Sequence, residues 1–251
     1  MKVLDVLLHD LPTGWQVQRV VIGTNWVLSV LSAGGEQRAG MASAPPVSIA
    51  TSDRSLGENV VGADAASIAQ LVESPESGLA AVGMATLNAL LQPDRAALSE
   101  MDAADWLCSR GTGRRVAIFG RFPFIQDELR PVAAKVWVFE LQPRHDEYGA
   151  EHIAEVLPQA DIVAITSSTL INHTIDDILC HAAPSSTVMV LGPGTPLSSR
   201  LFLSGIDILS GVEITNIVQA EQSVLAGVLF RQMKGFERVT LCNKRTVRCE
   251  T

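Results

Sequence analysis

Four hydroxyl side chains follow one another in the run Thr166-Ser167-Ser168-Thr169, directly after the apolar residues 162–165. A short continuous apolar run predicts a parallel strand that is buried on both faces. The hydroxyls would then lie between the carboxyl end of this strand and the next helix, where open α/β sheets bind ligands and free backbone N–H groups attract anions. Ser168 or Thr169 is expected to cap that helix. The neighbouring positions, Ser167 and Asn172 among them, are candidates for ligand binding, as is Thr169 itself.

A second loop of unusual composition, Gly192-Pro193-Gly194-Thr195-Pro196, continues from the next predicted strand, residues 187–192. Two glycines and two prolines predict a rigid, sharply turned loop with an open backbone. Because the carboxyl ends of neighbouring parallel strands meet at one sheet edge, we expect this loop and the hydroxyl run to open onto a common crevice. Gly192, Pro193 and Thr195 are therefore ligand-binding candidates. A rigid turn before a helix cap at Ser198 or Ser199 would explain the same residues without a ligand.

The position of a phosphate-binding turn is occupied by Gly120, which follows the apolar residues 116–119. The G-x-G-x-x-G pattern of dinucleotide folds is absent, and Phe122 and Phe124 would crowd a pyrophosphate there. Glu140 ends the following predicted strand, where a ribose-binding acid would lie. We therefore keep Gly120, Phe122 and Glu140 as ligand contacts without predicting a dinucleotide.

Metal-type ligands recur every four residues on a predicted helix at residues 170–182, at His173, Asp177 and His181. Imidazole and carboxylate suit a divalent transition metal. The apolar residues of this helix leave the three on its solvent side. His173 and His181 would be about 12 Å apart along the helix, so only a neighbouring pair could share an ion. The cysteines form no C-x-x-C pair, no G-x-S-x-G elbow occurs, and no catalytic nucleophile is indicated.

Composition and charge exclude several classes of protein. The chain has 251 residues and a net charge of −8, which argues against a nucleic-acid partner. No apolar run has the length of a membrane span, and residues 1–11 resemble an amphipathic helix more than a signal peptide. We expect a cytoplasmic protein of two domains.

The two halves of the chain differ in their periodicity. The first predicts strands at 18–22 and 26–31 around a turn at Thr24 and Asn25, and helices at 63–72 and 77–91. Residues 36–62 read as a long loop with one strand near 47–50. From residue 115 strands and helices alternate, which predicts a doubly wound parallel sheet. The expected strands are 115–120, 135–141, 162–166, 187–192, 205–209, 238–242 and 246–249, and the expected helices are 101–107, 125–131, 150–157, 170–182, 199–204 and 221–231.

The helix 77–91 is rich in small residues, with Asn88 as its conspicuous polar member. Its small side chains would let a second backbone approach closely, which leaves room for a homo-oligomer.

Four stretches of the chain resemble a family of bacterial and archaeal proteins described as "putative heavy-metal chelation". They are Gly57-Glu58-Asn59 and residues 80–89, 164–174 and 191–197. The resemblance implies an α+β front domain similar to the enolase amino-terminal domain, a Rossmann-like rear domain, and a ligand site in the cleft between them. This chain has Gly194 where the family often has serine, and His173 where glycine is common.

We predict an α/β protein with an enolase-N-terminal-like α+β domain at residues 1–110 and a Rossmann-like doubly wound domain at 111–251. Its interdomain cleft is expected to bind a small polar ligand, which by resemblance is a transition metal or metal chelate. The alternative is an enzyme that holds a nucleotide-like cofactor in the Rossmann-like domain; the sequence leaves open whether any reaction is catalysed. The expected ligand-binding residues are Thr24, Asn25, Asn88, Gly120, Phe122, Glu140, Ser167, Thr169, Asn172, Gly192, Pro193 and Thr195.

Overall fold

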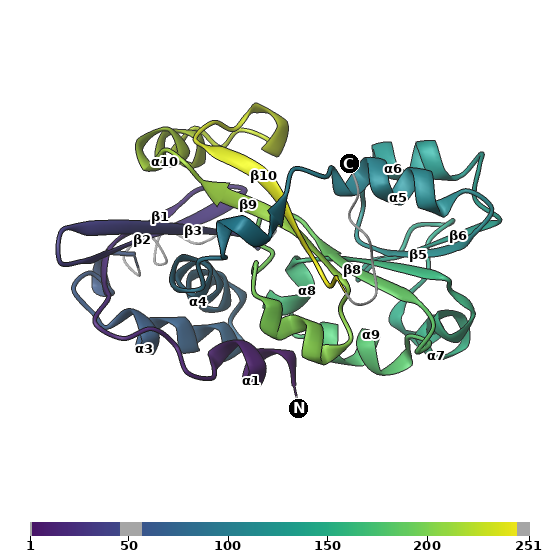
Figure 1. Cartoon of the computed structure of the whole chain (residues 1–251), viewed down its shortest axis with the longest axis horizontal. Coiled ribbons are helices and arrows are strands. Elements are labelled where there is room, and N and C mark those ends of the chain that lie inside the picture. The colour runs from purple at the N-terminus through teal and green to yellow at the C-terminus, as the bar shows by residue number, and fades with distance from the viewer. Residues whose placement is uncertain (1, 46–56, 245–251) are drawn as a thin grey trace.

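A computed structural model describes residues 2–45 and 57–244 of the chain (Figure 1). The first part contains a three-stranded antiparallel sheet of β1 (Gln16–Ile22), β2 (Trp26–Ala33) and β3 (Glu36–Ser43). The helices of this part are α1 (Val3–Leu8), α3 (Ala65–Ala69), η1 (Gln70–Glu73) and α4 (Ser77–Leu90). The hairpin and the two helices predicted at 63–72 and 77–91 are thereby confirmed.

Strand β3 corrects the prediction of a loop that begins at residue 36. Its inner residues are Ala39, Gly40, Met41 and Ala42, and three of them are too small to signal a strand by propensity. They are small because α4 crosses close above: a Cβ at Gly40 would collide with the backbone nitrogen of Ala89. Helix packing therefore selects this composition. The strand predicted near 47–50 lies outside the described residues.

The second part is a seven-stranded sheet in the order β4-β10-β9-β8-β7-β5-β6. Five neighbouring strands are parallel: β5 (Arg115–Phe119), β6 (Lys135–Phe139), β7 (Ile162–Thr166), β8 (Thr187–Leu191) and β9 (Ile208–Ile214). β10 (Phe236–Cys242) pairs antiparallel with β9 and with the short β4 (Leu98–Ser99). The expected α/β class is confirmed. The strand predicted at 205–209 is displaced toward the C-terminus, and the one at 246–249 lies outside the described residues.

Helices cover both faces of this sheet (Figure 1). α5 (Ala103–Gly111) and α6 (Pro123–Leu129) pack on one face, where Leu107 and Leu129 share a core with Ile118. α7 (Ile153–Val156), α8 (Ser168–Ile171) and α9 (Ile175–His181) pack on the other. The connections from β5 to β6 and from β6 to β7 lie on opposite faces, so the winding reverses between β5 and β7. Ligands of open α/β sheets bind outside the carboxyl ends of the strands at such a reversal.

The predicted helix 170–182 is interrupted, and this changes the metal hypothesis. Asn172 accepts hydrogen bonds at Oδ1 from the backbone nitrogen (3.2 Å) and the hydroxyl (2.7 Å) of Thr174, which compete with helical bonds. His173 adopts a positive φ of 60° between α8 and α9. The prediction that His173, Asp177 and His181 share one helix face was therefore wrong.

The two sheets share one hydrophobic core, in which Leu31 and Met84 lie in the same cluster as Val163 and Leu170. α10 (Ile217–Leu225) packs beside β1 and β2, and its cap Asn216 accepts a hydrogen bond from the nitrogen of Gln219, so this helix begins earlier than the predicted 221–231. The domain boundary at residue 110 stays a prediction. No helix in the described part of the chain is long and apolar enough to cross a membrane. The remaining short helices are η2 (Arg95–Ala97), η3 (Ala150–His152), η4 (Leu157–Gln159), η5 (Ser199–Ser204) and η6 (Phe230–Gln232).

Candidate functional site

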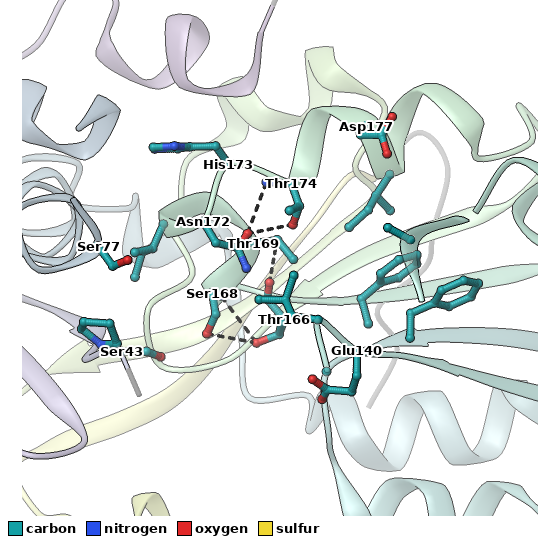
Figure 2. Close-up of a pocket in the computed structure, with 18 of the residues that line it drawn as sticks. Ser43, Ser77, Glu140, Thr166, Ser168, Thr169, Asn172, His173, Thr174 and Asp177 are labelled. Carbon is teal, nitrogen blue, oxygen red and sulfur yellow. Dashed lines mark hydrogen bonds between the residues drawn. The ribbon is translucent and has the colours of Figure 1, made fainter. Parts of the chain in front are cut away.

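A cavity of about 480 Å³ opens at the carboxyl ends of β5, β6 and β7, where the winding of the sheet reverses (Figure 2). We call it the switch-point pocket. Polar side chains come from the strand ends, from the α8 region and from the front part of the chain. The polar and glycine positions that line it are Ser43, Ser77, Gly120, Arg121, Glu140, Thr166, Ser168, Thr169, Asn172, His173, Thr174 and Asp177.

One wall of the pocket is the hydroxyl run, held in a tight turn. Thr169 Oγ1 donates to the carbonyl oxygen of Thr166 at 2.7 Å, and the backbone nitrogen of Ser168 donates to Thr166 Oγ1 at 3.4 Å. The hydroxyls of Thr166 and Ser168 are 3.5 Å apart, so neither is strongly engaged by the other (Figure 2). Ser168 and Thr169 lie inside α8 and do not cap it, contrary to the prediction. The Ser168 hydroxyl therefore remains available to a bound molecule.

Glu140 supplies a carboxylate at the end of β6. Its side chain is 17% exposed, and burial raises its pKa, while Arg121 at 3.9 Å opposes the rise. Arg121 is drawn away by Glu147, which accepts two hydrogen bonds from it at 2.9 and 2.7 Å. Glu140 is thus a partly buried carboxylate whose contact with Arg121 is long, which leaves it suited to a ligand hydroxyl or cation.

The floor of the pocket is apolar. Phe119 and Phe139 stack with their ring centroids 4.6 Å apart, and Ile153, Ile171 and Ile178 complete the surface. A flat or apolar part of a ligand would lose little by leaving water here.

Four of the twelve predicted site residues line this pocket: Gly120, Glu140, Thr169 and Asn172. Phe122 lies just before α6, half-buried against the core beside α5 and α6. Ser167 is only 2% exposed, and a Cβ at Gly192 would lie 2.8 Å from its hydroxyl oxygen. Phe122 therefore belongs to the core beside α6 and Ser167 packs against Gly192, and neither lines the cavity.

The glycine-proline loop does not open onto the switch-point pocket. Thr195 Oγ1 donates to the Gly192 carbonyl at 2.7 Å, and a Cβ at Gly194 would meet Ala42 Cα at 3.3 Å. Pro193 and Thr195 line a separate cavity of about 20 Å³. The prediction of a common crevice was wrong because β3, which was expected to be loop, covers this loop.

Asn88, Thr24 and Asn25 also lie away from the pocket. Asn88 Nδ2 donates to the carbonyl oxygens of Met41 (2.8 Å) and Gly194 (3.0 Å), so it joins β3 to the glycine-proline loop. Asn25 Nδ2 donates to the Gly227 carbonyl at 2.8 Å, and a Cβ at Gly227 would contact Thr24. These polar residues tie loops together.

Sequence reasoning missed the pocket residues that the front part supplies, of which Ser43 and Ser77 are polar and Ala44 and Pro45 apolar. Ser43 ends the unrecognised strand β3, and Ser77 starts α4 as an ordinary helix-terminal serine. No spacing in the sequence distinguishes either from a surface serine.

Metal-type ligands gather at Asp177, Cys180 and His181 among the described residues. His173 points elsewhere: its Nε2 lies 2.8 Å from the carbonyl oxygen of Val72. Within the predicted histidine-aspartate set, His181 and Asp177 approach each other, with Nδ1 and Oδ1 3.8 Å apart.

The fold and the pocket together define a two-sheet α/β protein with a ligand-sized cavity at the switch point of its parallel strands. Residues 102–243 match the model of the family described as "putative heavy-metal chelation", and residues 4–91 match a second model with the same description. The chain therefore belongs to this family, as its sequence motifs indicate.

Two solved structures share the fold over nearly the whole chain. A protein of unknown function from Desulfitobacterium hafniense, of the same family, is 22% identical with a TM-score of 0.80, covering 95% of this chain and 96% of its own. A protein of unknown function from Pyrococcus horikoshii, also of this family, is 18% identical with a TM-score of 0.79, covering 96% and 97%. No curated protein matches the chain.

Proposed function

We propose that the protein binds a small organic molecule in the switch-point pocket, and that a heavy metal reaches the pocket as a chelate of such a molecule. The observation that carries the proposal is the composition of the cavity, about 480 Å³ with a stacked aromatic floor and a rim of hydroxyl, amide and carboxylate side chains. Its lining acids and imidazole, Glu140, Asp177 and His173, do not form a three-ligand group with one another. The family description supports a metal, and this lining favours one that brings its own ligands.

Different groups of the pocket would contact different parts of the ligand. The hydroxyls of Thr166 and Ser168 would donate to carboxylate or carbonyl oxygens of the chelator. Glu140 would accept a hydrogen bond from a ligand hydroxyl or offset a positive charge. The surface of Phe119, Phe139 and Ile171 would cover the carbon skeleton.

A nucleotide-like cofactor is the second candidate. Two observations favour it: the pocket lies at the strand-order reversal, and Glu140 ends the strand after Gly120, where a ribose-binding acid would lie. The turn after β5 continues as Gly120-Arg121-Phe122-Pro123 and lacks the further glycines that let a pyrophosphate approach the backbone.

Thermal shift of the full chain separates these candidates. The probes are NAD, NADP, S-adenosylmethionine and ATP on one side, and citrate complexes of copper, nickel, cobalt, zinc and iron on the other. A ligand at a hundred times its Kd adds about 2.7 kcal/mol of stability. Ser168→Phe fills the pocket, and Ser185→Phe places the same ring at an exposed serine outside it.

We expect a citrate complex to shift the wild type and S185F beyond the shift given by its free metal ion, and to give S168F no such additional shift. A shift by one of the nucleotides alone would favour the second candidate. Absence of any shift across both sets, or an additional shift by a citrate complex over its free metal ion that S168F retains, would contradict the assignment of this pocket.

A further inference from the structure

Three side chains of different metal-binding chemistry meet on one face of α9, at the rim of the switch-point pocket. Asp177, Cys180 and His181 each offer a ligand atom, and these atoms all lie within 4.8 Å of one another. The spacing i, i+3, i+4 places them on one side of the helix. Asp177 also lines the pocket, where Figure 2 shows its carboxylate, so the trio adjoins the cavity through this residue.

The distances between the three ligand atoms are close to those found between neighbouring ligands of a bound metal ion. Cys180 Sγ and His181 Nδ1 are 3.1 Å apart, and His181 Nδ1 and Asp177 Oδ1 are 3.8 Å apart. Zinc–sulfur and zinc–nitrogen bonds of about 2.3 and 2.0 Å in tetrahedral geometry place neighbouring ligand atoms about 3.3–3.6 Å apart. Side-chain movements of a few tenths of an ångström therefore bring these pairs of ligand atoms to tetrahedral spacing.

The same two side chains share one backbone acceptor. Cys180 Sγ lies 3.1 Å and His181 Nδ1 lies 2.8 Å from the carbonyl oxygen of Asp177. Both groups are therefore directed at one backbone oxygen, and to bind a shared cation the thiol and the imidazole ring must turn from it toward the Asp177 carboxylate and lose their protons. The thiol is exposed, and the imidazole side chain is 33% exposed, so an ion from solvent can reach both.

We propose that Asp177, Cys180 and His181 form a site for a thiophilic divalent transition metal such as zinc or cobalt. Thiolate and imidazole select this class over magnesium or calcium, which prefer oxygen ligands. Three protein ligands leave a fourth coordination position open. Because Asp177 also faces the cavity, that position is accessible to a molecule in the switch-point pocket. The site goes beyond the pocket proposal, and either can fail without the other.

The test is a titration of the reduced full chain with cobalt(II) alone, followed by the near-ultraviolet thiolate-to-cobalt charge-transfer band. Cys180→Ser, His181→Gln and Asp177→Asn remove one ligand each. Cys108→Ser is the matched control, since Cys108 is a free, half-buried thiol on α5. Circular dichroism verifies that every variant is folded, and the S168F chain serves as a variant of the pocket alone.

We expect the wild type, C108S and S168F to bind one cobalt ion with the band, and C180S to lose the band. H181Q and D177N should bind at least about tenfold more weakly, since even the loss of an outer-shell partner of a metal ligand costs 10-fold or more. The proposal is overturned if the wild type shows no band, or if the band persists in C180S and disappears in C108S. Binding of cobalt with a normal band by H181Q and D177N would likewise exclude the trio.

Discussion

Replacing Asn88 by alanine tests whether this residue binds a ligand, as its sequence context predicts, or holds two backbone segments together. In the structure its Nδ2 donates to the carbonyl oxygens of Met41 and Gly194 at 2.8 and 3.0 Å. Its Oδ1 is buried and has no protein partner, and it borders a cavity of about 20 Å³. A cavity of that size is just large enough for one water molecule.

The expected cost follows from the two carbonyls that N88A leaves behind. A hydrogen bond contributes about 1 kcal/mol net, and a buried group left unsatisfied costs about 1–3 kcal/mol. Water entering the vacated space offsets part of this, so we expect about 2–3 kcal/mol of destabilisation. For a chain of this size that lowers Tm by roughly 5–10 °C. Asn88→Asp should destabilise the protein more than N88A near neutral pH, because a carboxylate oxygen then faces both carbonyl oxygens.

Urea unfolding and calorimetry of N88A, N88D and a control, Gln92→Ala, measure the effect. Gln92 is exposed one turn further along and donates to the carbonyls of Asn88 and Ala89, so its loss should cost less than about 1 kcal/mol. Pocket binding by the probes should survive in N88A at temperatures where it is folded. If N88A is as stable as the wild type and instead loses probe binding, the structural role assigned to Asn88 is refuted.

Three further substitutions probe the surroundings of the site. Arg121 holds the pKa of Glu147 at about 2, below its ordinary 4.5. The ion pair therefore contributes its full stabilisation of the folded state above pH 4.5, and this contribution is lost as the pH falls toward 2. Glu147→Gln should be about 1 kcal/mol less stable at pH 7, and the difference in unfolding free energy should disappear across that window; a pH-independent difference would contradict the pairing. His173→Gly should be more stable than His173→Ala by about 1 kcal/mol, because only glycine relieves the positive φ of 60°; equal stabilities in urea unfolding would contradict this. Gly83→Ala should unfold at much lower urea concentration than the wild type, because its Cβ would collide with the backbone nitrogen of Val72; an unchanged midpoint would show that α4 and η1 can separate freely.

The central strands β5, β7 and β8 could be predicted from sequence because each is a short apolar run followed by a turn or hydroxyl residue, whereas β9 contains Ser210, Gly211 and Glu213 and was predicted out of place. β7 was predicted at its observed bounds, and the α/β class followed from the alternation with helices. The break between α8 and α9 was harder to see, because it depends on the Asn172 side chain bonding to Thr174 and on the positive φ of His173. Glycine at position 173, common in the resembling family, would have marked the turn.

The candidate site was predicted in part, and the missing part depends on tertiary packing. Gly120, Glu140 and Thr169 were found because strand ends can be located from the sequence. The glycine-proline loop was assigned to the same cavity because it follows a parallel strand next to β7. The assignment failed because β3 covers this loop, and the small residues of β3, which fit against α4, carry no strand signal. A covering strand cannot be inferred from the loop that it covers.

The trio on α9 was missed for a different reason. Asp177 and His181 were considered with His173, while Cys180 was set aside for lack of a C-x-x-C partner. Only coordinates show that His173 turns toward Val72 and that Cys180 lies beside His181.

The central claim is that the switch-point pocket takes a metal together with an organic ligand. Equilibrium dialysis of the full chain against copper, nickel, cobalt, zinc and iron, each as the free ion and as its citrate complex, tests this most directly when metal and citrate are both analysed. We predict that the wild type and S185F retain at least one metal together with citrate, that S168F retains no citrate, and that free cobalt or zinc depends on Cys180. Loss of every metal and of citrate from the wild type on dialysis would contradict the claim.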